Sequence, residues 1–288
     1  MKAWLLALLL SLAGVALATP PLKVASYNLR LNDAGDGPNA WPHRREQVQA
    51  LIRYHRLDLV ATQEGLIDQI RDLEAMPRWA RVGVGRDDGR EGGEHSAIFF
   101  RRDRLALEDH GDFWLSATPE KPSMSWDSNC CHRLATWARL RDRASGQRFI
   151  AFSVHFDHEA AVSRRESARL LVERVKALSQ GLPVLCLGDF NATPDSEPVA
   201  IMRGALRDAR ELSETPPYGP VGTFNAFRWD AAADERIDYL FVSPGVRVLD
   251  YAVLTDSLRG RYTSDHFPLV VTVKWKKLDP SAGSQKTS

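Results

Sequence analysis

The residues from Gly188 to Pro194 combine side chains that can do chemistry on a phosphate group. They read Gly-Asp-Phe-Asn-Ala-Thr-Pro and follow the apolar run 183–187. Because side chains alternate between the two faces of a strand, Asp189 and Asn191 point to the same side if the strand continues that far. A carboxylate can orient or deprotonate a water molecule there, and an amide can donate a hydrogen bond to a phosphoryl oxygen. The segment therefore predicts a phosphate-processing site at the edge of a sheet.

Other polar residues end or interrupt apolar runs in the same way. A single Asn or Glu at the end of a strand commonly belongs to a turn, so each alone is only a hint of function. Asp238 carries more weight, because an ionised carboxylate inside the apolar run 237–242 needs a partner. The residues that share this placement are Asn28, Glu64, His155, Asp189, Asn191, Asp238, Asp265 and His266.

The hydrophobic pattern predicts the elements that must position these side chains. Residues 159–180 carry apolar positions at helical spacing and predict a long helix. Shorter helices are expected at 41–54 and 69–75. Strands are expected at 23–31, 57–63, 97–101, 105–114, 136–141, 148–155, 184–187, 237–242, 246–254 and 269–275.

The order of these elements indicates the fold class. Strands outnumber helices, and hairpin-like neighbours mix with strand–helix–strand units. This mixture favours an α/β (α+β) sandwich of mixed sheets over a purely parallel sheet. No internal repeat or Ser/Gly-rich linker divides the chain, so residues 19–278 are expected to form one domain and residues 279–288 a disordered polar tail.

Residues 1–18 resemble a secretory signal peptide, with Lys2 as its positive region, an apolar stretch at 4–15 and an Ala-Leu-Ala cleavage site that ends at Ala18. A membrane anchor is the alternative. However, the apolar run is short for a bilayer span of ~20 residues, and a helix-breaking Thr-Pro-Pro sequence follows it. We therefore expect cleavage after Ala18 and a secreted or periplasmic protein without stable membrane insertion.

The overall charge is nearly balanced, with 38 basic and 37 acidic residues and a net charge of +1. The chain therefore lacks the strong positive field that drives general binding to nucleic acids, although a local basic patch stays open. Hydrophobic residues make up 44% of the chain, which is enough for a substantial core.

The three cysteines are too few for a disulfide scaffold. The neighbours Cys130 and Cys131 can form a vicinal disulfide in an oxidising compartment. An unbonded loop pair with an apolar, buried Cys186 is the alternative. No spacing of cysteines suggests a zinc site.

Six motifs in their order resemble one enzyme superfamily. They are Ser-Tyr-Asn-Leu-Arg at 26–30, Gln-Glu-Gly at 63–65, Val-His-Phe-Asp at 154–157, the segment 188–194, Arg-Ile-Asp-Tyr-Leu-Phe-Val at 236–242 and Ser-Asp-His-Phe-Pro-Leu at 264–269. Together they look like the endonuclease/exonuclease/phosphatase superfamily, also called deoxyribonuclease I-like. The resemblance covers residues 23–275. It implies a four-layer sandwich of two mixed β-sheets flanked by helices, and a phosphoesterase that uses Mg²⁺ or sometimes Mn²⁺.

The resemblance implies a metal site at three of these positions. Glu64 supplies a hard oxygen ligand, which suits Mg²⁺ because this ion prefers carboxylates and keeps several waters. Asn28 is expected beside it as a neutral ligand or water anchor, and Asp265 is a further candidate near the metal.

The catalytic roles that the resemblance implies fall on five residues. His266, with its tautomer fixed by Asp238, and Asp189 are both candidates for activating water, and the choice between them stays open. His155, if protonated, would offset charge that develops in the transition state, and Asn191 would donate to a phosphoryl oxygen.

Two arginines add to this assignment. Arg133 is a candidate for contact with the substrate phosphate, with an internal salt bridge as the alternative. Arg30 stands where the apurinic-site nucleases of the superfamily carry an acidic residue, which argues against a DNA-repair enzyme. Segments 39–45, 93–99 and 113–116 resemble a bacterial branch of the superfamily, some members of which act on sugar phosphates.

The sequence as a whole thus predicts an exported metal-dependent phosphoesterase. It would hydrolyse phosphomonoesters or small phosphodiesters by in-line attack of activated water. A secreted metal-dependent nuclease is the alternative within the enzymes, and a binding module that lost catalysis is the alternative of another class. The expected partner is a small phosphate ester, with nucleic acid as the second option; the oligomeric state is left open.

Overall fold

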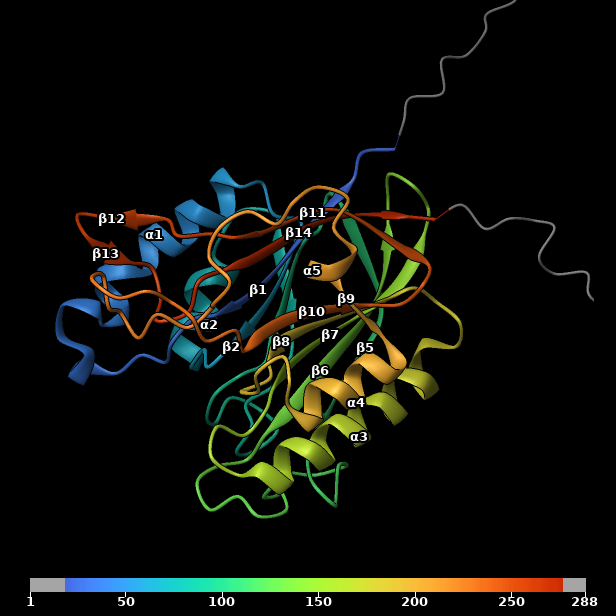
Figure 1. Ribbon diagram of the computed structural model, residues 1–288, viewed down its shortest axis with the longest axis horizontal. Helices are drawn as coiled ribbons and strands as arrows, with labels where there is room; N and C mark the ends of the chain where they lie inside the picture. The colour runs from blue at the N-terminus through green and yellow to red at the C-terminus, as the bar shows by residue number, and fades with distance from the viewer. Residues whose placement is uncertain (1–18, 277–288) are drawn as a thin grey trace, which may run out of the picture.

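The structure is a computed structural model that describes residues 19–276. The predicted signal peptide (1–18) and tail (279–288) lie outside the described residues. Two six-stranded sheets pack face to face, and helices cover the outer face of each sheet (Figure 1). The predicted four-layer sandwich of mixed sheets is therefore confirmed.

The first sheet has the strand order β11-β14-β1-β2-β4-β3. Only β1 and β2 are parallel, and the other neighbours are antiparallel. Helices α1 (Trp41–Tyr54) and α2 (Ile67–Glu74) cover its outer face, and the short 3-10 helix η1 (Ala34–Asn39) precedes α1. The strands are β1 (Leu22–Asn28), β2 (Leu59–Gln63), β3 (Trp79–Val82), β4 (Ile98–Arg101), β11 (Val246–Val253) and β14 (Leu269–Trp275).

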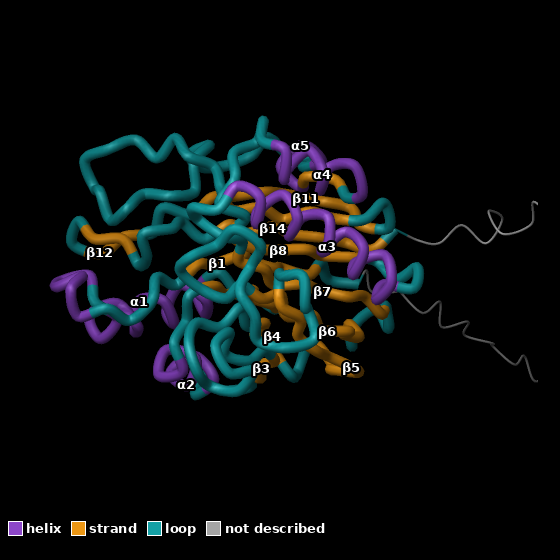
Figure 2. The backbone as a smooth tube through the Cα atoms, turned by 90° about the horizontal axis from the view of Figure 1, so that it is seen from below, coloured by secondary structure: helices purple, strands orange, loops and turns teal. Residues whose placement is uncertain are grey.

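The second sheet has the order β5-β6-β7-β8-β10-β9, and only β7 and β8 are parallel. Helices α3 (Ala161–Ser179) and α4 (Glu197–Ala205) cover its outer face, as Figure 2 shows from below. Its strands are β5 (Leu105–Trp114), β6 (Leu134–Asp142), β7 (Arg148–His155), β8 (Val184–Asp189), β9 (Arg207–Asp208) and β10 (Asp238–Val242). The one-turn helix α5 (Ala209–Leu212) and a separate hairpin of β12 (Ser257–Leu258) and β13 (Arg261–Tyr262) complete the chain.

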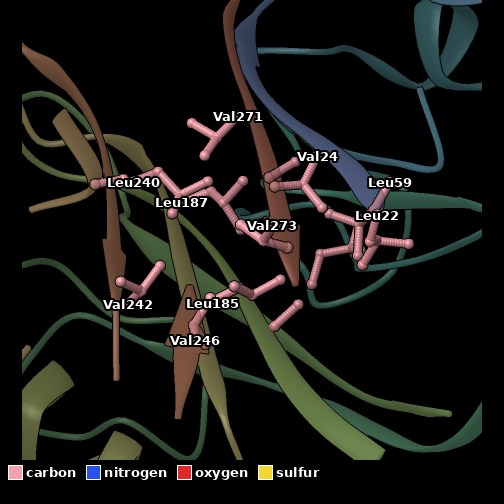
Figure 3. Packing of buried hydrophobic residues seen from close by; sticks show 14 of the residues in the cluster. Leu22, Val24, Leu59, Leu185, Leu187, Leu240, Val242, Val246, Val271 and Val273 are labelled. Carbon is pink, nitrogen blue, oxygen red and sulfur yellow. The ribbon is translucent and has the colours of Figure 1, made fainter. Parts of the chain in front are cut away.

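An apolar layer between the two sheets forms the centre of the molecule (Figure 3). Each strand contributes apolar side chains to this layer, because every second side chain points to the opposite sheet. In β8, Leu185 and Leu187 face the other sheet, whereas Val184 and Cys186 pack under α3 and α4. Two further apolar layers thus join each sheet to its own helices.

The same alternation brings polar residues to one end of the central layer. In β8 the next position after Leu185 and Leu187 on the inner face is Asp189, and in β7 the inner-face residues Phe149 and Ala151 lead to His155. Asn28 ends the inner face of β1, and Asp238 begins that of β10. The functional side chains therefore lie on the inner faces of the strands, and the packing of the core fixes the direction of these faces.

None of the helices in the described part of the chain has both the length and the apolar character needed to cross a bilayer.

We expect Leu240→Ala to destabilise the fold by about 2–5 kcal/mol, because Leu240 is fully buried in the central layer opposite Leu187 and its loss leaves a cavity. Urea unfolding followed by circular dichroism measures the change. Val221→Ala, at a side chain with 54% exposure, is the control and should change stability by less than about 0.5 kcal/mol. Equal stability of the two variants would contradict the assignment of the core.

Candidate active site

Three of the predicted residues stand side by side on neighbouring strands of the second sheet. In the ladder, His155 of β7 is paired with Asp189 of β8, and Asp189 is paired with Asp238 of β10. The three side chains share one face of the sheet, and His155 Nε2 lies 3.7 Å from Asp189 Oδ2. Register alone therefore brings together residues that are far apart in the chain.

The first sheet contributes the opposite wall of the site. Asn28 Nδ2 donates to Glu64 Oε1 at 2.9 Å and, across the gap between the sheets, to Asp189 Oδ2 at 3.0 Å. The Oδ1 atom of Asn28 accepts the backbone N–H of Arg30 at 3.0 Å, and the second oxygen of Glu64 accepts the N–H of Leu31 at 3.1 Å. The buried side chain of Asn28 thus fixes the positions of two carboxylates, those of Glu64 and Asp189, by hydrogen bonds.

His266 forms a second link between the sheets. It lies just before β14, and its Nδ1 contacts Asp238 Oδ2 at 2.8 Å, while its Nε2 lies 3.7 Å from Asp189 Oδ2. Burial alone would lower its pKa, but the charges of Asp238 and Asp189 raise the pKa of His266 well above its ordinary value. The ring is therefore protonated at neutral pH, with Asp238 holding one N–H and the other directed to the site.

For Asp189, burial favours the uncharged form. It is fully buried beside Asp238, and burial together with the charge of that neighbour raises the pKa of Asp189 to about 7. Hydrogen bonds from Asn28 and from the backbone N–H of Asn191, at 2.9 Å, offset part of this effect. A carboxylate with a pKa near neutral is suited to accept and release a proton.

The backbone is unusual where three strands lead into the site. Arg30, Glu64 and Asn191 have backbone φ values of 54°, 63° and 45°, which residues other than glycine seldom adopt. Such conformations persist where the surrounding structure fixes them, and they cluster at functional sites. Gly188 meets a different constraint, since a Cβ there would collide with the carbonyl oxygen of Val154 in the neighbouring strand.

The charge-offsetting role considered for His155 requires a protonated ring, and its surroundings disfavour that form. It is buried, and burial followed by the positive charge of Arg133 lowers the pKa of His155 well below its ordinary value. Nη1 of Arg133 lies 3.1 Å from Nε2 and 3.2 Å from Nδ1 of this ring. The permanent cation at this end of the site is therefore Arg133, and His155 is neutral.

The remaining predicted residues also border the site. Asn191 uses one of its two amide N–H groups on the carbonyl of Phe156 at 3.0 Å, which leaves the other for a ligand. Asp265 is buried, which raises its pKa, and it lies 4.0 Å from Arg30. Every residue predicted for the site lies in this cluster, while the individual roles stay predictions.

A cleft of about 360 Å³ opens above these groups. Its lining includes residues that the sequence reasoning missed as functional, namely Arg86, Glu94, His158 and Glu235. Glu94 is the most notable, because burial raises its pKa to about 7 despite an ion pair with Arg86. Its position just before the strand β4 repeats the pattern of polar residues next to apolar runs, and this signal could have identified it.

A vicinal disulfide borders the same cleft. Cys130 and Cys131 are bonded to each other, which was one of the two alternatives, and Cys186 is a buried free thiol in β8. Cys131 lines the cleft, and the sulfur of Cys130 lies 3.8 Å from Asp157 Oδ2. Asp157 lies 3.7 Å from Nε of Arg133, so the disulfide touches the residues that hold this arginine.

The donor set fits a divalent cation. Ligand atoms of Glu64, His155 and Asp189 lie within 4.8 Å of one another, and Asp265 adds a further carboxylate to the same cleft. Carboxylate oxygens are the ligands that Mg²⁺ and Mn²⁺ prefer. Burial raises the pKa of Asp189 and Asp265, and a cation would stabilise their ionised forms.

A larger cavity of about 650 Å³ lies away from these groups, next to the C-terminal end of α3. Among the described residues that line it, the ionisable ones are Lys176 and Lys276, and the rest are apolar or uncharged. It lacks the acid, base and metal-ligating groups that phosphate chemistry requires.

We expect Asp189→Asn to change the pH dependence of stability in chelator-treated protein. In the unfolded chain this carboxyl ionises near pH 4, whereas in the folded protein it stays protonated up to about pH 7. The contribution of this carboxyl to the stability of the wild type is therefore lost as pH rises from about 4 to 7, and the variant escapes this loss. Relative to wild type, the variant should gain on the order of 1–4 kcal/mol between pH 4 and pH 8.

Urea unfolding with EDTA at a series of pH values measures this difference. A constant offset from the hydrogen bond lost in the variant does not affect the test, because only the change with pH counts. Parallel stability curves for the two proteins would show that Asp189 ionises normally in the fold.

Comparison with known proteins places this geometry in a family. A model of the Endonuclease/Exonuclease/phosphatase family matches residues 25–266, which include the cluster from Asn28 to His266. The solved structure of a mannosyl-6-phosphatase from Bacteroides thetaiotaomicron is 38% identical, with a TM-score of 0.84 over 88% of this chain and 100% of that chain.

Two further relatives agree with this match. A solved structure of a family protein from Bacteroides vulgatus is 34% identical, with a TM-score of 0.85 over 89% of this chain and 99% of that chain. Nocturnin from Drosophila melanogaster is 26% identical in an alignment of 280 positions that covers 80% of this chain and 41% of that protein, so the chain spans about two fifths of that relative. The chain belongs to the endonuclease/exonuclease/phosphatase family of phosphoester hydrolases.

Proposed function

We propose that this protein is an exported phosphoesterase that depends on a divalent metal and hydrolyses small phosphomonoesters, with sugar phosphates as the leading substrate class. The single observation that carries the proposal is the convergence of Glu64, Asp189 and His266 from two different sheets on one cleft. A binding module that had lost catalysis would have no need for a buried carboxylate with a near-neutral pKa beside a protonated histidine.

The residues divide the reaction between them. Asp189 takes the proton of the attacking water, because its pKa lies near neutral and the cationic His266 is already protonated. His266 donates a hydrogen bond from Nε2 to a phosphoryl oxygen, while Asp238 keeps Nδ1 engaged. Asn191, with one free amide N–H, donates to a second oxygen.

Arg133 and the carboxylates complete the site. Arg133 supplies a fixed positive charge beside His155 and offsets charge that develops on the phosphoryl group. Glu64 and Asp265 would hold a divalent cation, preferably Mg²⁺. When bound, this cation polarises the phosphoryl group and stabilises the leaving oxygen.

The size of the cleft supports a small substrate. A volume of about 360 Å³ is near the lower end of the range for small-molecule sites. The likeness to a mannosyl-6-phosphatase, at 38% identity over most of both chains, supports a sugar phosphate. The polar groups from Glu94, His158 and Glu235 are available to hydroxyl groups on the substrate.

We expect the purified protein to release phosphate from sugar phosphates, mannose 6-phosphate included, with Mg²⁺ or Mn²⁺, and to lose this activity with EDTA. Asp189→Asn and His266→Ala should each lower kcat by at least about a hundredfold, because each removes a group that acts in proton transfer or charge stabilisation. Circular dichroism and thermal unfolding check that the variants fold.

Parallel assays separate the alternatives. Faster hydrolysis of bis-(p-nitrophenyl) phosphate and plasmid DNA than of any monoester would replace the proposal with a secreted nuclease. Full activity in folded Asp189→Asn and His266→Ala variants, or full activity in EDTA, would overturn the mechanism.

Export rests on the signal-like sequence of residues 1–18. Expressed with its full sequence in a bacterial host, the protein should be recovered from the periplasm or the medium with Thr19 as its first residue. Mass spectrometry of the intact protein measures this. Recovery from the cytoplasm with residues 1–18 still attached would contradict export.

A further inference from the structure

A third cavity, of about 280 Å³, lies between the start of α1 and the hairpin β12–β13. Figure 1 shows this hairpin beside α1 at the left of the molecule. The basic side chains that line it are His43, Arg44, Arg259 and Arg261, and no Asp or Glu among the described residues takes part in the lining. The cavity therefore brings three arginines together with no acidic side chain in its lining.

Arg44 forms the buried base of this cavity, with 3% exposure. Its guanidinium group donates only to backbone carbonyls, those of Asn39 at 2.7 Å, Arg30 at 2.7 Å, Thr263 at 3.0 Å, and Leu29. Within residues 19–276 no carboxylate lies within 4.0 Å of it. Carbonyls satisfy its N–H groups, and the carboxylates that act on its charge, Asp36, Glu64 and Asp265, do so without a direct ion pair.

Arg259 and Arg261 lie at the exposed rim, at the turn of the hairpin. Arg259 and Gly260 have φ values of 53° and 72°, as in a tight two-residue hairpin turn. In the described chain neither arginine has an ion-pair partner, whereas surface arginines elsewhere, such as Arg71 and Arg247, pair with glutamates. To the residues that the structure describes, the Arg261 side chain makes a single hydrogen bond, to the carbonyl of Pro38 at 3.5 Å.

An aromatic surface adjoins the same arginines. Tyr262 lines the cavity, and the ring of Trp229 lies 5.1 Å from that of Tyr262 at a tilt of 39°. Trp229 is 54% exposed, although an indole of this size is commonly buried. Exposed aromatic rings beside arginines are suited to stack on the ring of a ligand whose charged group binds the arginines.

The cavity and the catalytic cleft share two backbone segments. Arg44 donates to the carbonyl of Arg30, whose side chain lines the cleft, and to that of Thr263, which precedes the cleft residue Asp265 by two positions. A ligand in this cavity would therefore lie on the other side of the segments that carry Arg30 and Asp265.

We propose that this cavity is a second anion site that binds a phosphate group through Arg259 and Arg261 over the buried charge of Arg44. The phosphate can belong to the distal part of a substrate with two phosphates, or it can be free inorganic phosphate. The chemistry is the same in both cases, because planar guanidinium groups bind phosphate oxygens through paired hydrogen bonds.

The test is a titration of the wild type and of R259A/R261A with inorganic phosphate in an isothermal calorimeter. R102A/R143A is the matched control: it removes the same charge from two exposed arginines at the turns before β5 and β7, away from the cleft. The wild type and the control should bind two phosphates, one in the cleft and one here. R259A/R261A should bind one, or bind the second at least about tenfold more weakly.

Kinetics with a sugar monophosphate and a sugar bisphosphate then identify the source of the anion. If the substrate carries it, R259A/R261A raises KM for the bisphosphate alone. If it is free phosphate, added phosphate changes the activity of the wild type on both substrates beyond the competitive inhibition through the cleft, and the variant shows that competitive inhibition alone. Either result supports the site.

Two results would overturn the proposal. One is a single phosphate site in the wild type with unchanged affinity in R259A/R261A. The other is equal weakening in R102A/R143A, which would show a general effect of net charge. Because the calorimetric arm requires no turnover, its failure is independent of any failure of the proposed reaction.

Discussion

Two hydrogen-bonded contacts between the sheets determine where the functional groups of this protein stand. One joins Asn28 of β1 to Asp189 of β8 at 3.0 Å, and the other joins His266, just before β14, to Asp238 of β10 at 2.8 Å. Apolar contacts between sheets are strong but non-directional, so they leave the sheets some freedom to shift. These polar contacts have fixed geometry and remove that freedom at the edge where chemistry takes place.

The choice of an amide at position 28 follows from the charges around it. Glu64 and Asp189 both require a hydrogen-bond donor, and Asn28 provides one to each without adding a charge. A lysine would neutralise the carboxylates that a cation needs, and an aspartate would repel them. The raised pKa of Asp189 shows that this cluster is held together against its own electrostatics. Functional sites commonly hold groups in such unfavourable surroundings, at some cost in stability.

Much of this arrangement could be predicted from the sequence, because the relevant signals are local. Alternation in the runs that lead to His155 and Asp189 identified both strands and the polar residues at their ends. The helix at Trp41–Tyr54 has the predicted bounds. The motifs between Asn28 and His266 occur in the order of the family, and the family match agrees with them.

Other features depend on contacts that no local pattern contains. Strand β3 and the hairpin β12–β13 have two to four residues per strand, too few for a period to show, and α4 carries a proline in its first turn. Glu94 reaches the cleft because its neighbour His95 pairs with Gly65 and Gly85, which lie elsewhere in the chain. The neutral state of His155 results from burial and from Arg133, which lies directly before β6, elsewhere in the chain.

The bond between Cys130 and Cys131 joins two adjacent residues and therefore closes almost no loop of chain. In the chain-entropy account, a cross-link stabilises a fold by restricting a long loop in the unfolded state, and this one has none to restrict. Reducing it should leave the melting temperature nearly unchanged while two thiols replace a compact sulfur pair at the wall of the cleft. Samples prepared with and without dithiothreitol would then show the same melting temperature and the same circular dichroism. The wall of the cleft that meets the substrate would nevertheless differ chemically between them.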